Sequence, residues 1–272
     1  MAYDWPPLVP GDPDEVARRV SRVLEDAWHR LSDQQAAVIA GIAERWRLPY
    51  VLATLAEFKE AIKDFHRRVD VEATAFTRRQ LRHLYERGAV EASRAVGGSF
   101  TWTLAHSDAL NALAADSYDD ILRRSQEAGR MADQWYRKAR AAARREVPLL
   151  ASGNVTAVQA AKQLADRLAV DSLAHVVYRD GARVPVRAWA EAATLAKSAV
   201  AYNAGTLNRA REAGVRTVEV FDGIGCGWTS HRDPDTASRT LRTVEEAAQW
   251  PISHPRCRRA FGPRGLESGA GL

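Results

Sequence analysis

The sequence has few of the features that mark secreted or membrane proteins. It contains two cysteines in 272 residues, which is too few for the disulfide framework of a small secreted domain. No apolar run approaches the ~20 residues needed to cross a bilayer. Residues 1–15 lack the basic and apolar regions of a signal peptide. We therefore expect a chain that folds in a reducing cytoplasm and does not contact a membrane.

The motifs of common enzymes are also missing. The chain has no phosphate-binding glycine loop followed by a lysine and no nucleophile elbow. It also lacks the His-x-Glu and Pro-Cys-x2-Cys signature of nucleobase deaminases. The net charge of +5 permits contact with nucleic acid or an acidic protein but requires neither. We expect no enzymatic activity and no small-molecule substrate.

What is present is helical periodicity over the first half of the chain. Asp12 and Pro13 are typical of a helix start. Ser32 with Gln35 forms a capping-box pattern that predicts a second helix, ending near Leu48. Periodic apolar residues then continue to about Val96.

The same half of the chain also predicts a kink and a further helix. The periodic stretch that ends near Val96 is long enough to predict a kink, near Asp70 or Gly88. Ser107 is a candidate cap for another helix over residues 108–147. We therefore expect an elongated set of helices from residue 12 to residue 150.

The pattern changes after the break at residues 148–154, where we place a domain boundary. Thr156 with Gln159 predicts a helix to about Leu168, and residues 175–186 predict a hairpin across the Asp180-Gly181 turn. Residues 188–213 predict a helix closed by Gly214, followed by a strand over residues 216–221. The predicted fold is α+β: an arm (1–11), a helical domain (12–150), a small α+β domain (151–264) and a flexible tail (265–272).

Four potential metal ligands lie in the C-terminal domain. Cys226 and His231 form one pair, and His254 and Cys257 form another after a gap of 22 residues. Thiolate and imidazole are the ligands that Zn²⁺ selects, so a structural zinc site is one interpretation. Reduced cysteines in a packed lobe and a Cys226–Cys257 disulfide are the alternatives. The aspartates at 222, 233 and 235 are candidate ligands of a hard cation in a metal-dependent nuclease, although Asp-Pro-Asp is more often simply a turn.

A run of cations marks the end of the predicted helix over residues 108–147. It contains Arg137, Lys138, Arg140, Arg144 and Arg145. Cations near a helix C-terminus are commonly a solvated face that interacts with the helix dipole. The alternative function is a contact with nucleic acid phosphates or with an acidic partner.

Several of these motifs together resemble a known family. The loop Gly225–His231, the segment Ile252–Arg258, the Tyr178–Gly181 turn and a helix with Tyr202-Asn203 and Gly205 resemble the C-terminal signature of MuF-like minor capsid proteins of tailed bacteriophages. The resemblance covers residues 152–263, and the helical half matches only in length and character. Many members carry two cysteines in the first loop, where this chain has Cys226 and His231.

The resemblance implies a structural role in head morphogenesis. Such proteins associate with the portal, enter the procapsid and touch packaged DNA or accompany it on ejection. It therefore implies a virion location, at the capsid interior or the portal vertex. The rival functions are a metal-dependent nuclease or capsid-maturation enzyme, and a stand-alone DNA-binding protein.

Overall fold

The computed structural model of the chain describes residues 13–45, 47–150, 157–178, 180–221, 240–257 and 259–264. Helices hold 77% of these residues, and the described strands form two small antiparallel sheets. The predicted α+β class with a helical majority is confirmed. The predicted Cys/His loop falls largely on residues 222–239, outside the described residues.

Contacts group the chain into two units that are not consecutive in sequence. We call residues up to Val20, Thr74–Asp119 and those from Glu191 onward the sheet unit, and Ser21–Ala73 with Asp120–Ala190 the bundle unit. The chain passes between them inside four helices: α1 (Pro13–Glu44), α2 (Leu48–Ala75), α4 (Leu104–Leu150) and α6 (Val186–Glu212). The domain boundary near residue 150 stays a prediction.

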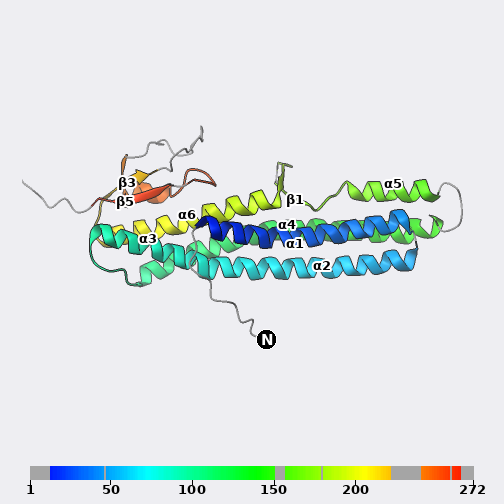
Figure 1. Cartoon of the computed structure of the whole chain (residues 1–272), viewed down its shortest axis with the longest axis horizontal. Coiled ribbons are helices and arrows are strands. Elements are labelled where there is room, and N and C mark those ends of the chain that lie inside the picture. Colours follow the sequence, from blue (N-terminus) through cyan, green and yellow to red (C-terminus); the bar gives the residue numbers. More distant parts are fainter. Residues whose placement is uncertain are drawn as a thin grey trace, which may run out of the picture. The chain divides into compact units, whose positions relative to one another are not determined.

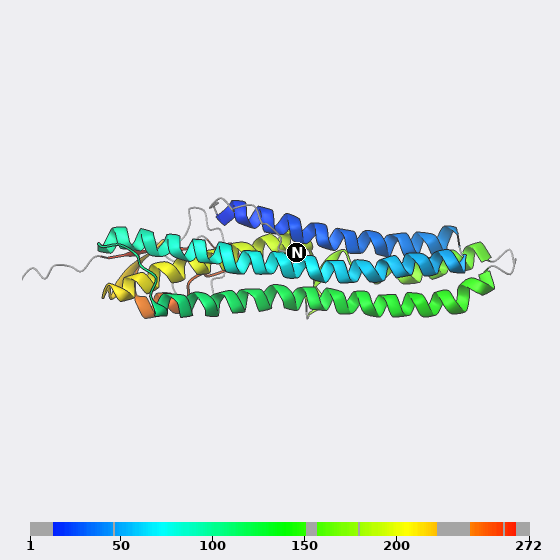
Figure 2. The same cartoon turned by 90° about the horizontal axis from the view of Figure 1, so that it is seen from below.

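Aromatic side chains join the helices of the bundle unit. Within it, α1, α2 and α4 run side by side (Figures 1 and 2). Trp28 of α1 meets the ring of Phe65 of α2 edge-on, with 4.5 Å between ring centroids. Phe58 of α2 meets Trp135 of α4 at 4.8 Å. Because all four rings are almost fully buried, they form the centre of this unit.

The bundle unit also contains the predicted hairpin. Helix α5 (Ala157–Ala169) precedes β1 (His175–Val177) and β2 (Arg183–Pro185), which pair antiparallel with Val176 opposite Val184. The amide of Ala182 donates to Asp180 Oδ1 at 3.0 Å, and Gly181 has φ +84°. The predicted helix, hairpin and Asp-Gly turn are confirmed.

A three-stranded sheet gives the other unit its name. Strand β3 (Thr217–Phe221) lies between β4 (Leu241–Thr243) and β5 (Ala260–Pro263), both antiparallel to it (Figure 1). The short helix α7 (Val244–Gln249) follows β4. Buried side chains from β3, β5, α6 and α7 form one apolar cluster: Leu207, Val218, Val220, Val244 and Phe261. The strand predicted over residues 216–221 is therefore the central strand of the sheet.

Two glycines let α3 (Leu81–Val96) and α6 touch backbone to backbone within the sheet unit. A Cβ atom on Gly88 would lie 2.0 Å from the carbonyl oxygen of Tyr202, and one on Gly205 would lie 2.0 Å from that of Tyr85. The Thr206 hydroxyl donates to the carbonyl of Gly88 at 3.2 Å. The crossing therefore requires glycine on both helices.

Three predictions about the helical half are wrong in detail. Helix α1 is continuous through Ser32, because Gln35 does not cap a helix. Its buried amide instead donates to the carbonyl of Asp171 at 2.8 Å and accepts from the amide of Leu173 at 3.1 Å. Helix α4 begins at Leu104 rather than after Ser107, and it continues through Pro148 to Leu150, where the sequence predicted a break. The Thr103 hydroxyl accepts from the amide of His106 at 3.4 Å, which makes Thr103 the cap.

The irregular turn of this long stretch lies at neither of the two positions predicted for a kink. Asp70 is inside α2 and Gly88 is inside α3, while the change of helix geometry falls between them, at the π-helical segment η1 (Phe76–Gln80). Such single-turn segments interrupt the regular hydrogen-bond ladder of a long helix. Among the described helices, none combines the length and apolar character of a membrane span.

Candidate functional site

Residues from the middle of α6 hold the C-terminal segment in the sheet unit. The buried Asn203 amide nitrogen donates to the carbonyls of Pro251 at 2.7 Å and Arg259 at 2.8 Å. These carbonyls lie on either side of the segment that carries His254 and Cys257. Two hydrogen bonds from one side chain thus fix both ends of this segment against α6.

The described half of the predicted metal site is a tight turn. The amide of Cys257 donates to the carbonyl of His254 at 2.9 Å, and the Cys257 side chain is buried with a free thiol. The other two predicted ligands, Cys226 and His231, and the aspartates at 222, 233 and 235 lie outside the described residues. No cluster of three potential metal ligands occurs within the described ranges. The zinc site stays a prediction.

All five residues of the predicted basic contact are exposed on α4, in the bundle unit. Lys138 pairs with Asp171 at 2.7 Å, and Arg145 pairs with Glu146 at 2.7 Å. Glu146 also pairs with Arg167 at 2.6 Å. Burial alone would raise the pKa of Glu146, but the hydrogen bonds and charges of Arg145 and Arg167 outweigh it and lower that pKa. Two of the five cations are therefore engaged within the unit.

The other three cations form what we call the arginine stripe: Arg137, Arg140 and Arg144. Their spacing of three and four residues places them on one face of α4. None of them forms an ion pair with a carboxylate in the described part of the chain. The neighbouring face, with Trp135 and Ala139, is buried. The stripe is thus held on a packed helix and presents its guanidinium groups to solvent.

Sequence patterns gave no sign of a partly buried chain of hydrogen bonds between α3, α4 and α6 in the sheet unit. The amide nitrogen of Asn208 can only donate, so the Tyr85 hydroxyl accepts from it at 2.8 Å and donates its own proton to His106 Nδ1 at 2.8 Å. His106 Nε2 then donates to Glu212 at 3.3 Å. Burial raises the pKa of Tyr85. Its members lie on three helices that are separated in sequence, and they come together only in the folded chain.

Tyr202, one residue before Asn203, links α6 to α3. Its hydroxyl donates to Glu91. Burial first, and then the hydrogen bond and charge of Glu91, raise the pKa of this hydroxyl. Tyr202, Asn203 and Gly205 therefore each make a distinct contact from one stretch of α6: with Glu91, with the C-terminal segment and with the backbone of α3.

A known protein family matches the part of the chain that contains α3, α4 and α6. The family model of phage minor capsid protein 2 matches residues 49–226. This range includes α2, α3 and α4, where the sequence had predicted only a general likeness, and it ends before the segment with His254 and Cys257. No curated protein and no solved structure matches the chain significantly. Since the match spans well over half of its residues, the chain belongs to the phage minor capsid protein 2 family.

Proposed function

We propose that the chain acts in head morphogenesis at the portal vertex of a tailed phage. Family membership makes it a component of the phage capsid and favours a structural over an enzymatic role. The MuF-like features of the hairpin, of α6 and of the C-terminal segment support the assignment to the portal vertex. The arginine stripe supplies a surface for a partner, because exposed guanidinium groups bind carboxylates in a bidentate manner.

The portal contact is tested by cross-linking mass spectrometry on procapsids from infected cells. We expect cross-links between α4 and the portal protein, and their loss when Arg137, Arg140 and Arg144 are all changed to Glu. The matched control changes three exposed cations of α2, Lys59, Lys63 and Arg67, to Glu, with the same change in net charge. Equal loss in both triple variants would show that net charge, and not the stripe, determines the association.

Contact with packaged DNA is the second candidate function of the stripe. The observation that favours it is the absence of a described carboxylate partner for all three arginines, since guanidinium groups bind phosphates equally well. Binding of duplex DNA should weaken with salt, and each lost phosphate contact should reduce the slope of log K against log salt by about 0.9. An unchanged slope in the triple stripe variant would rule out this contact.

We also propose that Cys226, His231, His254 and Cys257 hold a structural zinc. The support is the spacing of two thiols and two imidazoles, together with the tight turn between His254 and Cys257. Bound zinc would cross-link two segments of the C-terminal region. Protein purified without chelator or metal-binding tag should contain about one zinc per chain, and Cys257→Ser should lose it. Fully folded wild-type protein without metal would refute this proposal.

A further inference from the structure

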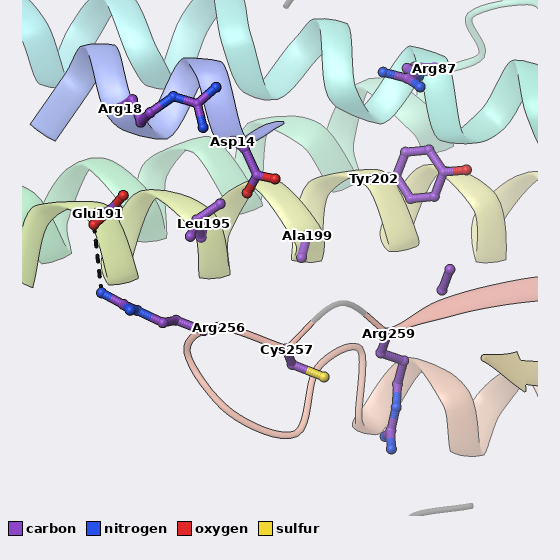
Figure 3. Close-up of a pocket in the computed structure, with 11 residues that line it drawn as sticks. Asp14, Arg18, Arg87, Glu191, Leu195, Ala199, Tyr202, Arg256, Cys257 and Arg259 are labelled. Atoms are coloured by element: carbon purple, nitrogen blue, oxygen red, sulfur yellow. Dashed lines mark ion pairs between the residues drawn. The ribbon is translucent and has the colours of Figure 1, made fainter. Parts of the chain in front are cut away.

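The sheet unit contains a pocket of 610 Å³, and Cys257, one of the four proposed zinc ligands, is among the residues that line it. Four parts of the unit line it: the first turns of α1, helix α3, helix α6 and the C-terminal segment (Figure 3). Pockets of several hundred Å³ are the usual size for side chains of a peptide or for a small ligand. A site assembled from four separate segments depends on the folded unit as a whole.

The floor of the pocket is largely apolar. Leu195 and Ala199 face it from α6, and Cys257 and Ala260 face it from the C-terminal segment. Leu195 and Ala199 are partly buried. An occupant with an apolar side chain would remove this surface from water, at ~25 cal/mol per Å² of apolar area.

Arginines from three different elements surround this floor. They are Arg18 of α1, Arg87 of α3, and Arg256 and Arg259 of the C-terminal segment (Figure 3). Asp14 and Glu191 are the acidic lining residues.

Arg256 and Arg87 keep donors for a ligand. Arg256 and Glu191 are 3.6 Å apart, and both side chains reach solvent, so this ion pair is weak and exchangeable. Arg87 uses its Nε to reach Glu91 at 3.1 Å, which leaves its terminal nitrogens available to donate. Guanidinium groups on three sides of an apolar floor form an environment suited to an anion with an apolar body.

We propose that this pocket binds an acidic peptide segment of a partner protein, with an apolar side chain on the floor and carboxylates against Arg87 and Arg256. A duplex nucleic acid does not fit, because it presents phosphates and not apolar groups on its outside. A small inorganic anion would leave the floor in contact with water. The pocket residues belong to the sheet unit, whereas the arginine stripe proposed for the portal and DNA contacts belongs to the bundle unit.

The test is calorimetric titration of the full-length protein with a capped peptide, Asp-Leu-Phe-Glu-Leu-Asp. We expect binding that weakens with salt. We expect no binding of two control peptides, one with lysines for the acidic residues and one with serines for the apolar residues. Arg256→Glu should weaken binding by about tenfold or more, and Ala199→Trp, which fills the pocket, should abolish it.

The matched control is Arg123→Glu, which makes the same charge change on an exposed arginine of the bundle unit outside the arginine stripe and should leave the affinity unchanged. Circular dichroism and thermal unfolding of each variant show whether it folds. Binding that neither Arg256→Glu nor Ala199→Trp alters, or no binding at all, would overturn the proposal.

A third protein variant distinguishes an external partner from the chain itself. Residues 1–12 contain Asp4, Trp5 and Leu8, which have the same chemistry as the probe peptide, and they directly precede α1. A variant without residues 1–12 should bind the peptide as the full-length protein does. If only the shortened variant binds it, the chain's own N-terminal residues occupy the pocket, and the external partner is excluded.

Discussion

At the scale of residues, Asn203 connects helix α6 to the C-terminal segment. Its amide nitrogen donates hydrogen bonds to the carbonyls of Pro251 and Arg259, which lie 48 and 56 residues further along the chain. Asparagine is a poor helix former, so its presence in the middle of α6 is explained by these contacts and not by helix propensity. It is the residue whose loss should most directly release the segment with His254 and Cys257.

Asn203→Ala should lower the free energy of unfolding by about 1–3 kcal/mol, because it removes the shared donor of two carbonyls. It should also make the segment after Pro251 more sensitive to proteolysis. Chemical denaturation and limited proteolysis measure both effects. Asn111→Ala, at an exposed position of α4, is the control and should change neither. Equal stability of Asn203→Ala and wild type would refute this role.

Tyr202 should make the free energy of unfolding depend on pH in the alkaline range. Because its pKa is raised in the folded protein, the unfolded chain loses this proton near pH ~10 while the folded chain keeps it. The protonated hydroxyl therefore contributes its full stabilisation of the folded state below about pH 10. This stabilisation decreases as the pH rises above that value. Tyr85 should contribute in the same direction, since burial raises its pKa as well.

Tyr202→Phe should therefore reduce the loss of stability above about pH 10. The measurement is the free energy of unfolding as a function of pH for wild type, Tyr202→Phe and the control Tyr50→Phe. Tyr50 lies on α2 of the bundle unit and is partly exposed. An identical pH dependence in wild type and Tyr202→Phe would contradict the raised pKa.

At the scale of elements, α3 and α6 cross so closely that neither Gly88 nor Gly205 can be replaced by a larger residue without a clash. Gly205→Ala should destabilise the protein by about 2–3 kcal/mol, because the new methyl group would overlap the backbone carbonyl of Tyr85 at 2.0 Å. Thermal unfolding measures this loss.

Gly41→Ala is the matched control for this prediction. There the nearest atom is the ring of Tyr50 at 2.9 Å, which is a partly exposed side chain that can move. This variant should gain up to ~1 kcal/mol from helix propensity. If the two alanine variants were equally stable, the backbone contact would not limit the crossing.

Elements with strong local signals could be predicted from the sequence. The hairpin has the Asp180-Gly181 turn, and Gly214, two residues after the end of α6 at Glu212, has φ +74°, as predicted for an αL cap. The start of α4 was misplaced because Ser107, one turn inside the helix, bonds back to the carbonyl of Thr103 at 3.0 Å instead of capping. Hydroxyls in these two roles look alike in sequence.

Elements that depend on distant partners could not be predicted. Strands β4 and β5 have three and four residues and exist because both pair with β3. One local signal was available, since Thr243 and Glu246 form a complete capping box at the start of α7. For the site, the exposure of the five basic residues followed from their charge. Their division into paired cations and the arginine stripe depends on Asp171, Glu146 and Arg167, which the fold brings beside α4.

At the scale of the whole molecule, each passage between the two units lies inside a helix, at α1, α2, α4 and α6. A chain divided this way has no loop where one cut separates the units. The sheet unit needs α3 from the first half of the sequence and α6 with β3–β5 from the second half. We therefore expect neither half to fold alone.

A fragment of residues 1–150 tests this expectation against the predicted domain boundary. It lacks α6, which contacts α3 in the intact chain, and it lacks α5, whose Leu168 carbonyl accepts from Trp135 Nε1 at 2.9 Å. Hydrogen exchange should show little protection over residues 81–119 in the fragment and strong protection in the full chain. Full protection in the fragment would instead establish an independent helical domain.

We conclude that this chain is a minor structural component of the phage head. Quantitative peptide mass spectrometry on purified, nuclease-treated virions of the source phage tests it most directly. We predict a few to a few dozen copies per particle, retained through purification. Abundant chain in infected cells with none in virions or procapsids would contradict the claim and point to a factor that acts outside the particle.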